Sequence, residues 1–405
     1  MTGGTSYNAA YGSFNLVGGT TIDLANSNSC QRFNRNHSPV GTDEFSSGGT
    51  EVCGGTQTFY VLKDPSAIGS VNLSDRSNFY RYQIRTDLRI IRSEWLPRSG
   101  SSPNYNNGPA LSSGCSNTSN TTTWRRCTEI TPEYAPGLYR TAAEERENFA
   151  TWFSYHRTRM KAAKAGASAA FSELGGDVRV GFRTIWQRNG STTTANWPRQ
   201  DVPIPVGYND GRFEDKDGAN LDNRTKWYSR LHGSIGQGGT PLHGALHQAG
   251  KYFSGDGADG PYGPQTGTEQ LACRQNFAIL TTDGYWNSNS NYPSGERVGN
   301  ADGTDGLLIT EPSTGASYQY KHGPPYSDSY TPTGNQYDTL ADVAMHYWKT
   351  DLRPTMANIV PTTDANPAFW QHMVTFGLSI GLSGSLGYES VEDVPSDFSG
   401  WPNPM

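Results

Sequence analysis

The sequence has no long apolar run and no block of lysine and arginine. A helix that crosses a bilayer needs about 20 consecutive apolar residues, so no transmembrane segment is expected. The start, Met1-Thr-Gly-Gly-Thr, lacks the basic and apolar parts of a signal peptide. If the protein is exported, this sequence is therefore expected to be a mature or truncated part of it. Nucleic acids normally bind basic surfaces, and the net charge of −6 therefore argues against a nucleic-acid partner.

Hydrophobic residues are also scarce, at 34% of the chain. Glycine and proline, 47 and 24 of 405 residues, stay below the level of disordered low-complexity protein. Aromatic residues make up 12% and bury a large area each. We therefore expect a folded but loop-rich protein.

The five cysteines are Cys30, Cys53, Cys115, Cys127 and Cys273. Pairing Cys30 with Cys53 and Cys115 with Cys127 would close short loops, and each disulfide would stabilise the fold by roughly 3 kcal/mol. Disulfides of this kind predict a protein outside the cytosol. The alternative is five reduced thiols, while zinc is disfavoured because no Cys-x-x-Cys spacing occurs. Cys273 is the odd thiol or belongs to another pairing.

Residues 1–140 predict a loop-rich region with short strands, and the regular pattern begins at residue 141. Alternating residues indicate strands at 57–63, 79–84 and 88–91 in the first region. In the second, 141–405, helical and strand patterns alternate, and a long loop occupies 285–336. This order favours an α/β fold, a parallel sheet with helices on both faces. The expected helices are 142–171, 225–232, one that starts at Thr240 and runs through Phe253, 337–350 and a short turn at 367–372, and the expected strands are 177–186, 277–280 and 373–380.

The best candidate site combines Thr240 and Asp283. Asp283 follows the apolar run Phe277–Leu280, which predicts a buried strand that ends in a carboxylate. Thr240 follows two glycines and precedes a helical pattern. Ligands of open α/β sheets sit at the carboxyl ends of strands, and oxygen ligands there suit Mg²⁺. The alternative is that Thr240 caps the helix and Asp283 caps a turn.

Three other motifs are weaker. The run 233–240 resembles a phosphate-binding loop, but Gly239 stands where the lysine belongs. The run 215–222 hints at a calcium loop but has a displaced glycine and no closing glutamate. A zinc site could form from three histidines, but the glutamate of the metalloprotease motif is missing; these are His232, His243 and His247.

Five blocks of the sequence are distinctive: Glu145–Arg159, Gly238–Leu242, Cys273–Asn287, Thr339–Pro354 and Phe369–Phe376. They closely resemble the PilY/PilC family of type IV pilus tip-associated biogenesis proteins and adhesins. The resemblance covers roughly 140–405, and residues 1–140 match loosely, as a variable insertion.

The resemblance implies a von Willebrand factor A-like fold, a doubly wound, mostly parallel sheet with large loop-rich insertions. It also implies a metal-ion-dependent adhesion site with Mg²⁺, in which Thr240 is the hydroxyl ligand and Asp283 the carboxylate. The first loop of such a site should read Asp-x-Ser-x-Ser, and this sequence has no such motif. Asp64-Pro-Ser66 and Asp397-Phe-Ser399 are partial lookalikes. We expect the true motif, with its strand, to precede residue 1, and the family's C-terminal propeller to lie beyond Met405.

The sequence thus predicts a bacterial, extracellular protein of the pilus tip or cell surface, without enzymatic activity. The resemblance implies minor pilins and pilus tip components as partners, and a host or surface receptor for adhesion. One alternative is a secreted hydrolase with Asp283 in its cleft, although no nucleophile-elbow spacing occurs. Another is a pilus-priming module that binds no receptor.

Overall fold

The chain forms two compact units, Met1–Ala169 and Ala170–Met405. In the computed structural model the described residues are 4–6, 21–23, 26–33, 39–40, 50–53, 55–67, 71–72, 74–87, 89–96, 123–130, 144, 148, 151–152, 155–156, 159–185, 204, 211–215, 223–234, 239–256, 260–263, 270–282, 286, 292, 294–328, 338–379 and 395–399. The predicted boundary between residues 140 and 141 separates a variable insertion from a von Willebrand factor A-like domain. That assignment of domains stays a prediction.

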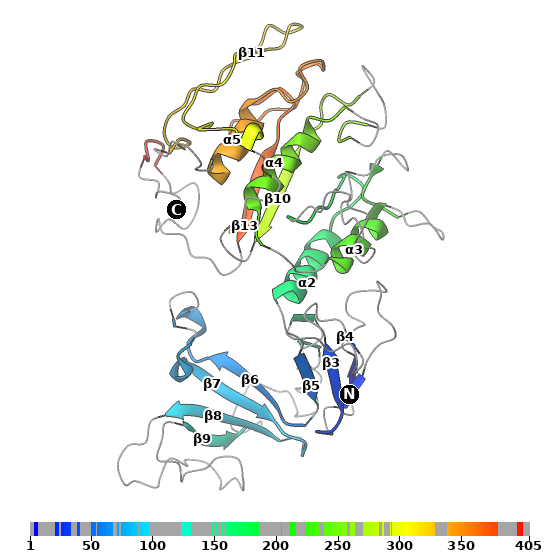
Figure 1. The fold of residues 1–405 in the computed structure, drawn as a ribbon, viewed down its shortest axis with the longest axis vertical. Coiled ribbons are helices and arrows are strands. Elements are labelled where there is room, and N and C mark those ends of the chain that lie inside the picture. Colours follow the sequence, from blue (N-terminus) through cyan, green and yellow to red (C-terminus); the bar gives the residue numbers. More distant parts are fainter. Residues whose placement is uncertain are drawn as a thin grey trace. The chain divides into compact units, whose positions relative to one another are not determined.

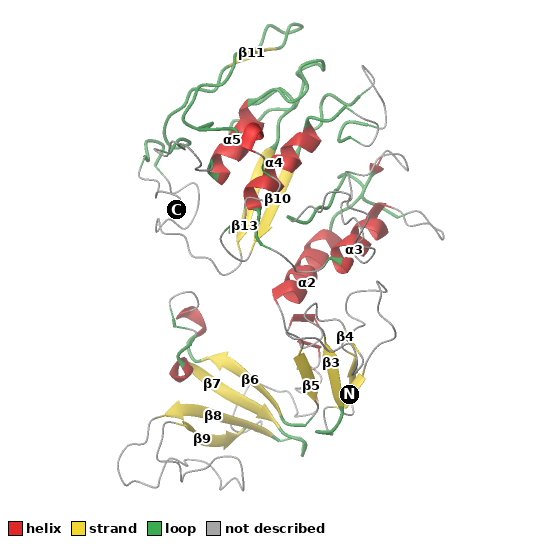
Figure 2. Ribbon diagram, viewed as in Figure 1, coloured by secondary structure: helices red, strands yellow, loops and turns green. Residues whose placement is uncertain are grey.

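The first unit is built from antiparallel strands (Figures 1 and 2). The largest sheet among its described residues has four strands in the order β6-β7-β8-β9. The strands predicted at 57–63, 79–84 and 88–91 are confirmed as β6 to β8, although β8 extends to Leu96, and β9 was not predicted. The strands are β1 (Gly4–Ser6), β2 (Thr21–Asp23), β3 (Cys30–Phe33), β4 (Pro39–Val40), β5 (Thr50–Cys53), β6 (Gln57–Leu62), β7 (Phe79–Ile84), β8 (Ile90–Leu96) and β9 (Thr123–Glu129), with short 3-10 turns η3 (Pro65–Ala67) and η4 (Arg76–Asn78).

Helix α2 (Arg159–Ser172) confirms the second half of the helix predicted at 142–171. Ala170, near the end of this helix, is exposed. Lys161 is buried instead. The long aliphatic stem of a lysine can cover apolar surface, so a charged residue need not mark the outer face of a helix.

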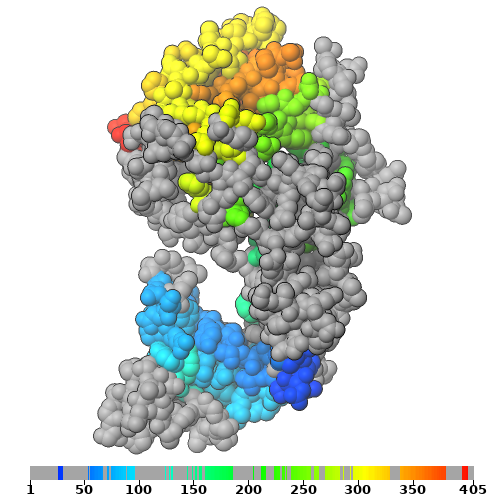
Figure 3. All heavy atoms as spheres, viewed as in Figure 1, coloured from blue at the N-terminus to red at the C-terminus, as the bar shows by residue number. Residues whose placement is uncertain are grey.

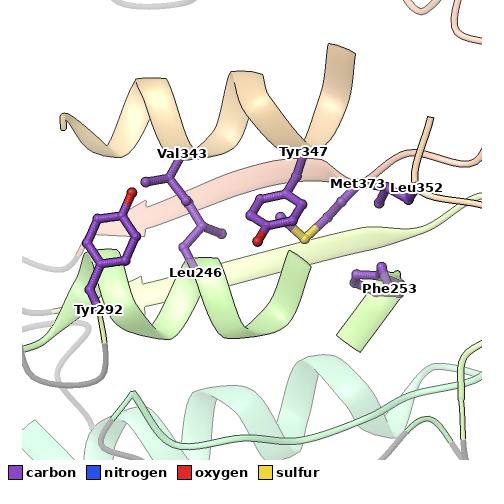
Figure 4. Packing of buried hydrophobic residues seen from close by; sticks show 7 residues of the cluster. All are labelled: Leu246, Phe253, Tyr292, Val343, Tyr347, Leu352 and Met373. Atoms are coloured by element: carbon purple, nitrogen blue, oxygen red, sulfur yellow. The ribbon is translucent and has the colours of Figure 1, made fainter. Parts of the chain in front are cut away.

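The second unit contains a parallel pair of strands covered by two helices (Figure 1). β10 pairs with β13 in parallel, from Phe277 opposite Val374 to Thr282 opposite Ser379. Helices α4 and α5 pack on one face of this pair, and their side chains form the main core (Figure 4). The elements of the unit are α3 (Asn223–Gly233), α4 (Leu242–Phe253), β10 (Phe277–Thr282), η7 (Ser294–Glu296), β11 (Ile309–Thr310), β12 (Ser317–Tyr318), α5 (Leu340–Lys349) and β13 (Val374–Ser379). The core residues are Leu246, Phe253, Tyr292, Val343, Tyr347, Leu352 and Met373.

β10 is half-buried, so the prediction of a fully buried strand is wrong. Its side chains alternate between exposed and partly buried because α4 and α5 cover one face of the described sheet. The other face carries four exposed apolar side chains: Phe277 (51%), Ile279 (59%), Phe376 (52%) and Leu378 (54%). The parallel pairing of β10 and β13 confirms the predicted parallel sheet of an α/β fold. The prediction of helices on both faces is not confirmed, because the described helices cover one face.

Two predicted elements are wrong. The segment 177–185 contains one isolated bridge residue, Phe182, instead of a strand. It is held by Trp227 of α3, whose indole N–H donates to the carbonyl of Gly181 at 3.1 Å, so side-chain packing replaces strand pairing. Residues 367–372 form no helical turn. Their aromatic Trp370 is fully buried and donates to the carbonyl of Trp348 at 3.0 Å.

Candidate functional site

Both helices of the core begin at the edge of the sheet where the two strands end. In Figure 4 the arrowheads of β10 and β13 point towards the end of α4 that carries Leu246, and away from Phe253. Val343, near the start of α5, lies at the same end. We call this end the carboxyl edge. It is where ligands sit in open α/β sheets.

Thr240 lies at the carboxyl edge, two residues before the start of α4. It is partly buried, and its carbonyl accepts a hydrogen bond from the amide of Leu242 at 3.0 Å. The N-cap residue of α4 is Pro241, which makes no side-chain cap. The capping alternative required Thr240 to be the N-cap residue of α4, and Thr240 is not that residue.

Asp283 lies outside the described residues, directly after Thr282, the last residue of β10. α4 packs against β10, and the strand ends at the edge where the helix begins. Thr282, the residue before Asp283, and the start of α4, which Thr240 precedes by two residues, thus belong to the same edge. The convergence of Thr240 and Asp283 stays a prediction.

The described residues do not make a complete metal site. No group of three or more His, Cys, Asp or Glu side chains among them is arranged to hold a metal ion. The Asp-x-Ser lookalike at Asp64 is satisfied locally, because Oδ1 of Asp64 accepts from Ser66 N at 3.0 Å and from Ser66 Oγ at 2.5 Å. Thr240 alone does not fit Mg²⁺, and coordination there would require Asp283 and further oxygen ligands.

A buried histidine follows Thr240 in the first turn of α4. The ring of His243 packs edge-on against Trp286 at 4.9 Å and lies 6.4 Å from the ring of Tyr292. Burial lowers the pKa of His243 to about 4, against an opposing effect of Asp338. The imidazole is therefore neutral at pH 7, and it forms an aromatic wall with Trp286 and Tyr292 beside the carboxyl edge.

One turn further along α4, His247 links three elements. Its Nε2 lies 2.9 Å from Glu296 of η7, and its Nδ1 lies 3.0 Å from the hydroxyl of Tyr347 on α5. Lys251 donates to the same Glu296 carboxylate at 2.7 Å and is the main cause of its lowered pKa. Both nitrogens of His247 are occupied, which argues against zinc ligation by His243 and His247.

The weaker motifs gain no support. Asp215, at the start of the suspected calcium loop, accepts a hydrogen bond from the amide of Thr225 at 2.8 Å, in the first turn of α3. The rest of that loop, 216–222, lies outside the described residues, as do residues 235–238 of the phosphate-loop lookalike.

Asp338 anchors the long loop and was missed by sequence reasoning. Its carboxylate accepts from the amide of Val298 at 2.7 Å and from the hydroxyl of Tyr292. Burial, followed by this bond, raises the pKa of Tyr292. The residues directly after Asp338 carry a pattern that the sequence does show: Thr339 and Asp342 form a reciprocal capping box at the start of α5. That pattern could have drawn attention to Asp338.

The cysteine predictions are confirmed in part. Cys30 and Cys53 form a disulfide and lie opposite each other on β3 and β5. Cys127 is buried and disulfide-bonded. Cys115 lies outside the described residues, so its pairing with Cys127 stays a prediction. Cys273 is exposed and forms no disulfide.

Known proteins with related sequences come from one group. The chain is 34% identical over 286 residues to the type IV pilus biogenesis factor PilY1 of Pseudomonas aeruginosa strain PAO1, covering 65% of this chain and 22% of the relative. It is 33% identical over 281 residues to PilY1 of strain PAK, with the same coverage, and 33% identical over 263 residues to PilY1 of strain UCBPP-PA14, covering 61% of this chain and 20% of that relative. The chain thus spans about a fifth of the length of these curated relatives. The resemblance found in the sequence blocks is confirmed.

No protein-family model matches the sequence. No solved structure matches the fold. Among the described helices, none is long and apolar enough to cross a membrane.

Proposed function

Since this chain is related over 65% of its length to the type IV pilus biogenesis factor PilY1, we propose that it acts in type IV pilus biogenesis at the bacterial cell surface. Minor pilins and other components of the pilus tip are the proposed partners. The Cys30–Cys53 disulfide supports an extracellular location because such bonds persist in oxidising compartments.

Within this function, the α/β layer is proposed to be von Willebrand factor A-like and to bind a surface receptor through the carboxyl edge. The observation that carries this proposal is the shared edge: α4, preceded by Thr240, starts where β10, followed by Asp283, ends. A hydroxyl and a carboxylate at that edge would supply oxygen ligands to Mg²⁺, and a carboxylate of the receptor would complete the coordination.

Titration calorimetry with Mg²⁺ and Mn²⁺ tests the metal. Wild-type protein is expected to release or absorb heat on binding, and Asp283→Ala and Thr240→Val are expected to abolish it. Asp305→Ala is the matched control, because Asp305 is a carboxylate paired with Lys321 at 2.7 Å in the long loop. Equal or absent heats for wild type and Asp283→Ala would reject a metal site at this edge.

Piliation and adhesion assays separate the remaining possibilities. Cells that lack this chain are expected to carry fewer surface pili, and the wild-type gene should restore them. If Asp283→Ala restores pili but not adhesion, the edge binds a receptor. If Asp283→Ala restores both, the chain acts as a priming module without a receptor. Loss of a hydrolytic activity in Asp283→Ala would instead favour the secreted hydrolase.

A further inference from the structure

The long loop is attached to α5 by a pair of buried carboxyl groups. Asp302 in the loop is 1% exposed, and Asp342 in the first turn of α5 is fully buried. The amide of Asp302 donates to Oδ1 of Asp342 at 3.2 Å. In the space-filling view the yellow loop lies directly against the orange region that contains α5 (Figure 3).

The two carboxyl groups differ in how they are satisfied. Asp342 accepts from the amide and the hydroxyl of Thr339, at 2.8 and 3.1 Å, as well as from Asp302. Asp302 accepts one long bond, from the amide of Asp328 to Oδ2 at 3.4 Å. Oδ1 of Asp302 is buried and has no hydrogen-bond partner among the described residues. A buried carboxylate oxygen without a donor is unfavourable.

No cation of the described loop or of α5 forms an ion pair with Asp302. The buried amine of Lys349 interacts with the charge of Asp302, but its hydrogen bonds go to neutral oxygens of Ala301 and Thr304. The hydroxyl of Tyr320 donates to the carbonyl of Asp302 at 2.9 Å. The other charged groups that act on the pair are Asp328 and Lys349, and Asp305 in turn acts on Lys349.

We propose that Asp302 and Asp342 share one proton, and that this shared proton fastens the loop of residues 297–328 to the first turn of α5. A proton on either carboxyl supplies the donor that Oδ1 of Asp302 lacks. It also removes one of two like charges that would otherwise face each other in a buried site.

The titration of the pair agrees with this arrangement. Burial, followed by the charges of Asp342 and Asp328, raises the pKa of Asp302 to about 7. Burial likewise raises the pKa of Asp342. Because the pKa of the attached state lies above that of a free aspartate, attachment is strongest in acid and weakens as the pH rises towards 7.

Release of this attachment would change an exposed apolar surface. Leu307 and Leu308 follow the attached turn, and Leu307 is 82% exposed. The shared proton would thus control how firmly the loop presents these side chains. This regulation does not depend on the proposed metal site, since it involves neither Thr240 nor Asp283.

Hydrogen exchange of the full chain, read by mass spectrometry in peptides that cover 300–306 and 326–328, tests the proposal. After correction for the intrinsic exchange rate, protection is expected to fall about tenfold per pH unit between pH 5 and 6.5, and to level off above about pH 7. A peptide from α4 is the internal control and should not follow this slope.

Substitutions complete the test. Asp302→Asn should abolish the slope and keep the loop protected at every pH, because the amide donates permanently to Asp342. Asp305→Asn, an exposed carboxylate in the same loop, should retain the slope. Asp342→Asn should also abolish it and serves if Asp302→Asn does not fold.

Three results would overturn the proposal. They are a flat wild-type profile, a slope that survives in Asp302→Asn, and protection at pH 8 that millimolar Ca²⁺ restores in wild type but not in Asp302→Asn. The last result would mean that a cation, rather than a proton, joins the two carboxyl groups.

Discussion

The ammonium group of Lys349, in the last turn of α5, donates a hydrogen bond of 2.6 Å to the carbonyl oxygen of Ala301 in the long loop. It also donates to the carbonyl and the hydroxyl of Thr304, at 2.7 and 3.0 Å. One side chain of the helix therefore donates to two carbonyls and one hydroxyl of a segment that has little regular structure. Buried amines cost desolvation energy, and burial lowers the pKa of Lys349 accordingly.

Replacement of this lysine should destabilise the second unit. Lys349→Met leaves two loop carbonyls without their donor, and we expect the free energy of unfolding to fall by about 1–3 kcal/mol. Lys321→Met is the control, because Lys321 is an exposed partner of Asp305 and exposed pairs contribute about 1 kcal/mol or less. Urea unfolding of both variants gives the comparison. Equal losses would show that the bonds of Lys349 contribute no more than a surface pair.

The core between the helices and the sheet should be sensitive to cavities. Leu246 of α4 is 2% exposed and lies in the core cluster. Leu246→Ala is expected to lower the free energy of unfolding by about 2–5 kcal/mol. Leu307→Ala, in the exposed part of the loop, should change it by about 0.5 kcal/mol or less. Denaturant titrations of the two variants decide the matter, and a loss below about 1 kcal/mol for Leu246→Ala would contradict the packing described.

The open face of the sheet gives a different expectation. Ile279 and Phe376 are more than half exposed, so Ile279→Thr and Phe376→Thr should each change stability by about 0.5 kcal/mol or less. Met373→Ala, at a fully buried position beside β13, is the control and should cost about 2–5 kcal/mol. If the exposed-face variants cost as much as the control, that face is covered in solution.

The cysteines should react differently. Under native, non-reducing conditions a thiol reagent is expected to label Cys273, while peptide mapping recovers Cys30 linked to Cys53. Cys30→Ser should lower the stability of the first unit by roughly 3 kcal/mol, because the disulfide constrains the unfolded chain. Cys273→Ser is the matched control and should leave stability unchanged. Labelling of Cys30 before reduction would rule out the disulfide.

Acid should destabilise the folded state through the buried His243. Its pKa in the folded state, about 4, lies below the ordinary value of 6.5, so the folded state binds fewer protons. The stability it contributes is complete above about pH 6.5 and is lost as the pH falls towards 4. Unfolding measured from pH 7 to 4 should therefore lose part of its pH dependence in His243→Gln. His322→Gln, which replaces an exposed histidine, is the control. If the pH dependence of unfolding in His243→Gln equals that of the wild type, the burial of the His243 ring is contradicted.

Local patterns predicted much of the second unit. The helical spacing of apolar residues located α4 and α5, and short apolar runs located β10 and β13, because these elements bury one side and repeat with a fixed period. The same logic failed at residues 177–185. There the alternation of apolar residues is real, but Trp227 takes the backbone carbonyl and the aromatic contact. Propensity did not reveal that competition.

The sequence by itself determined the relationship to pilus biogenesis factors, the helices and strands of the core, and the cysteines available for disulfides, since these depend on residue identity and local spacing. The tertiary structure alone decided that Asp302 meets Asp342, that His247 bridges Glu296 and Tyr347, and that one face of β10 is open. The contacts among these join residues about 40 to 100 positions apart, and the packing of helix on helix and of loop on helix, which local patterns do not encode, brings them together.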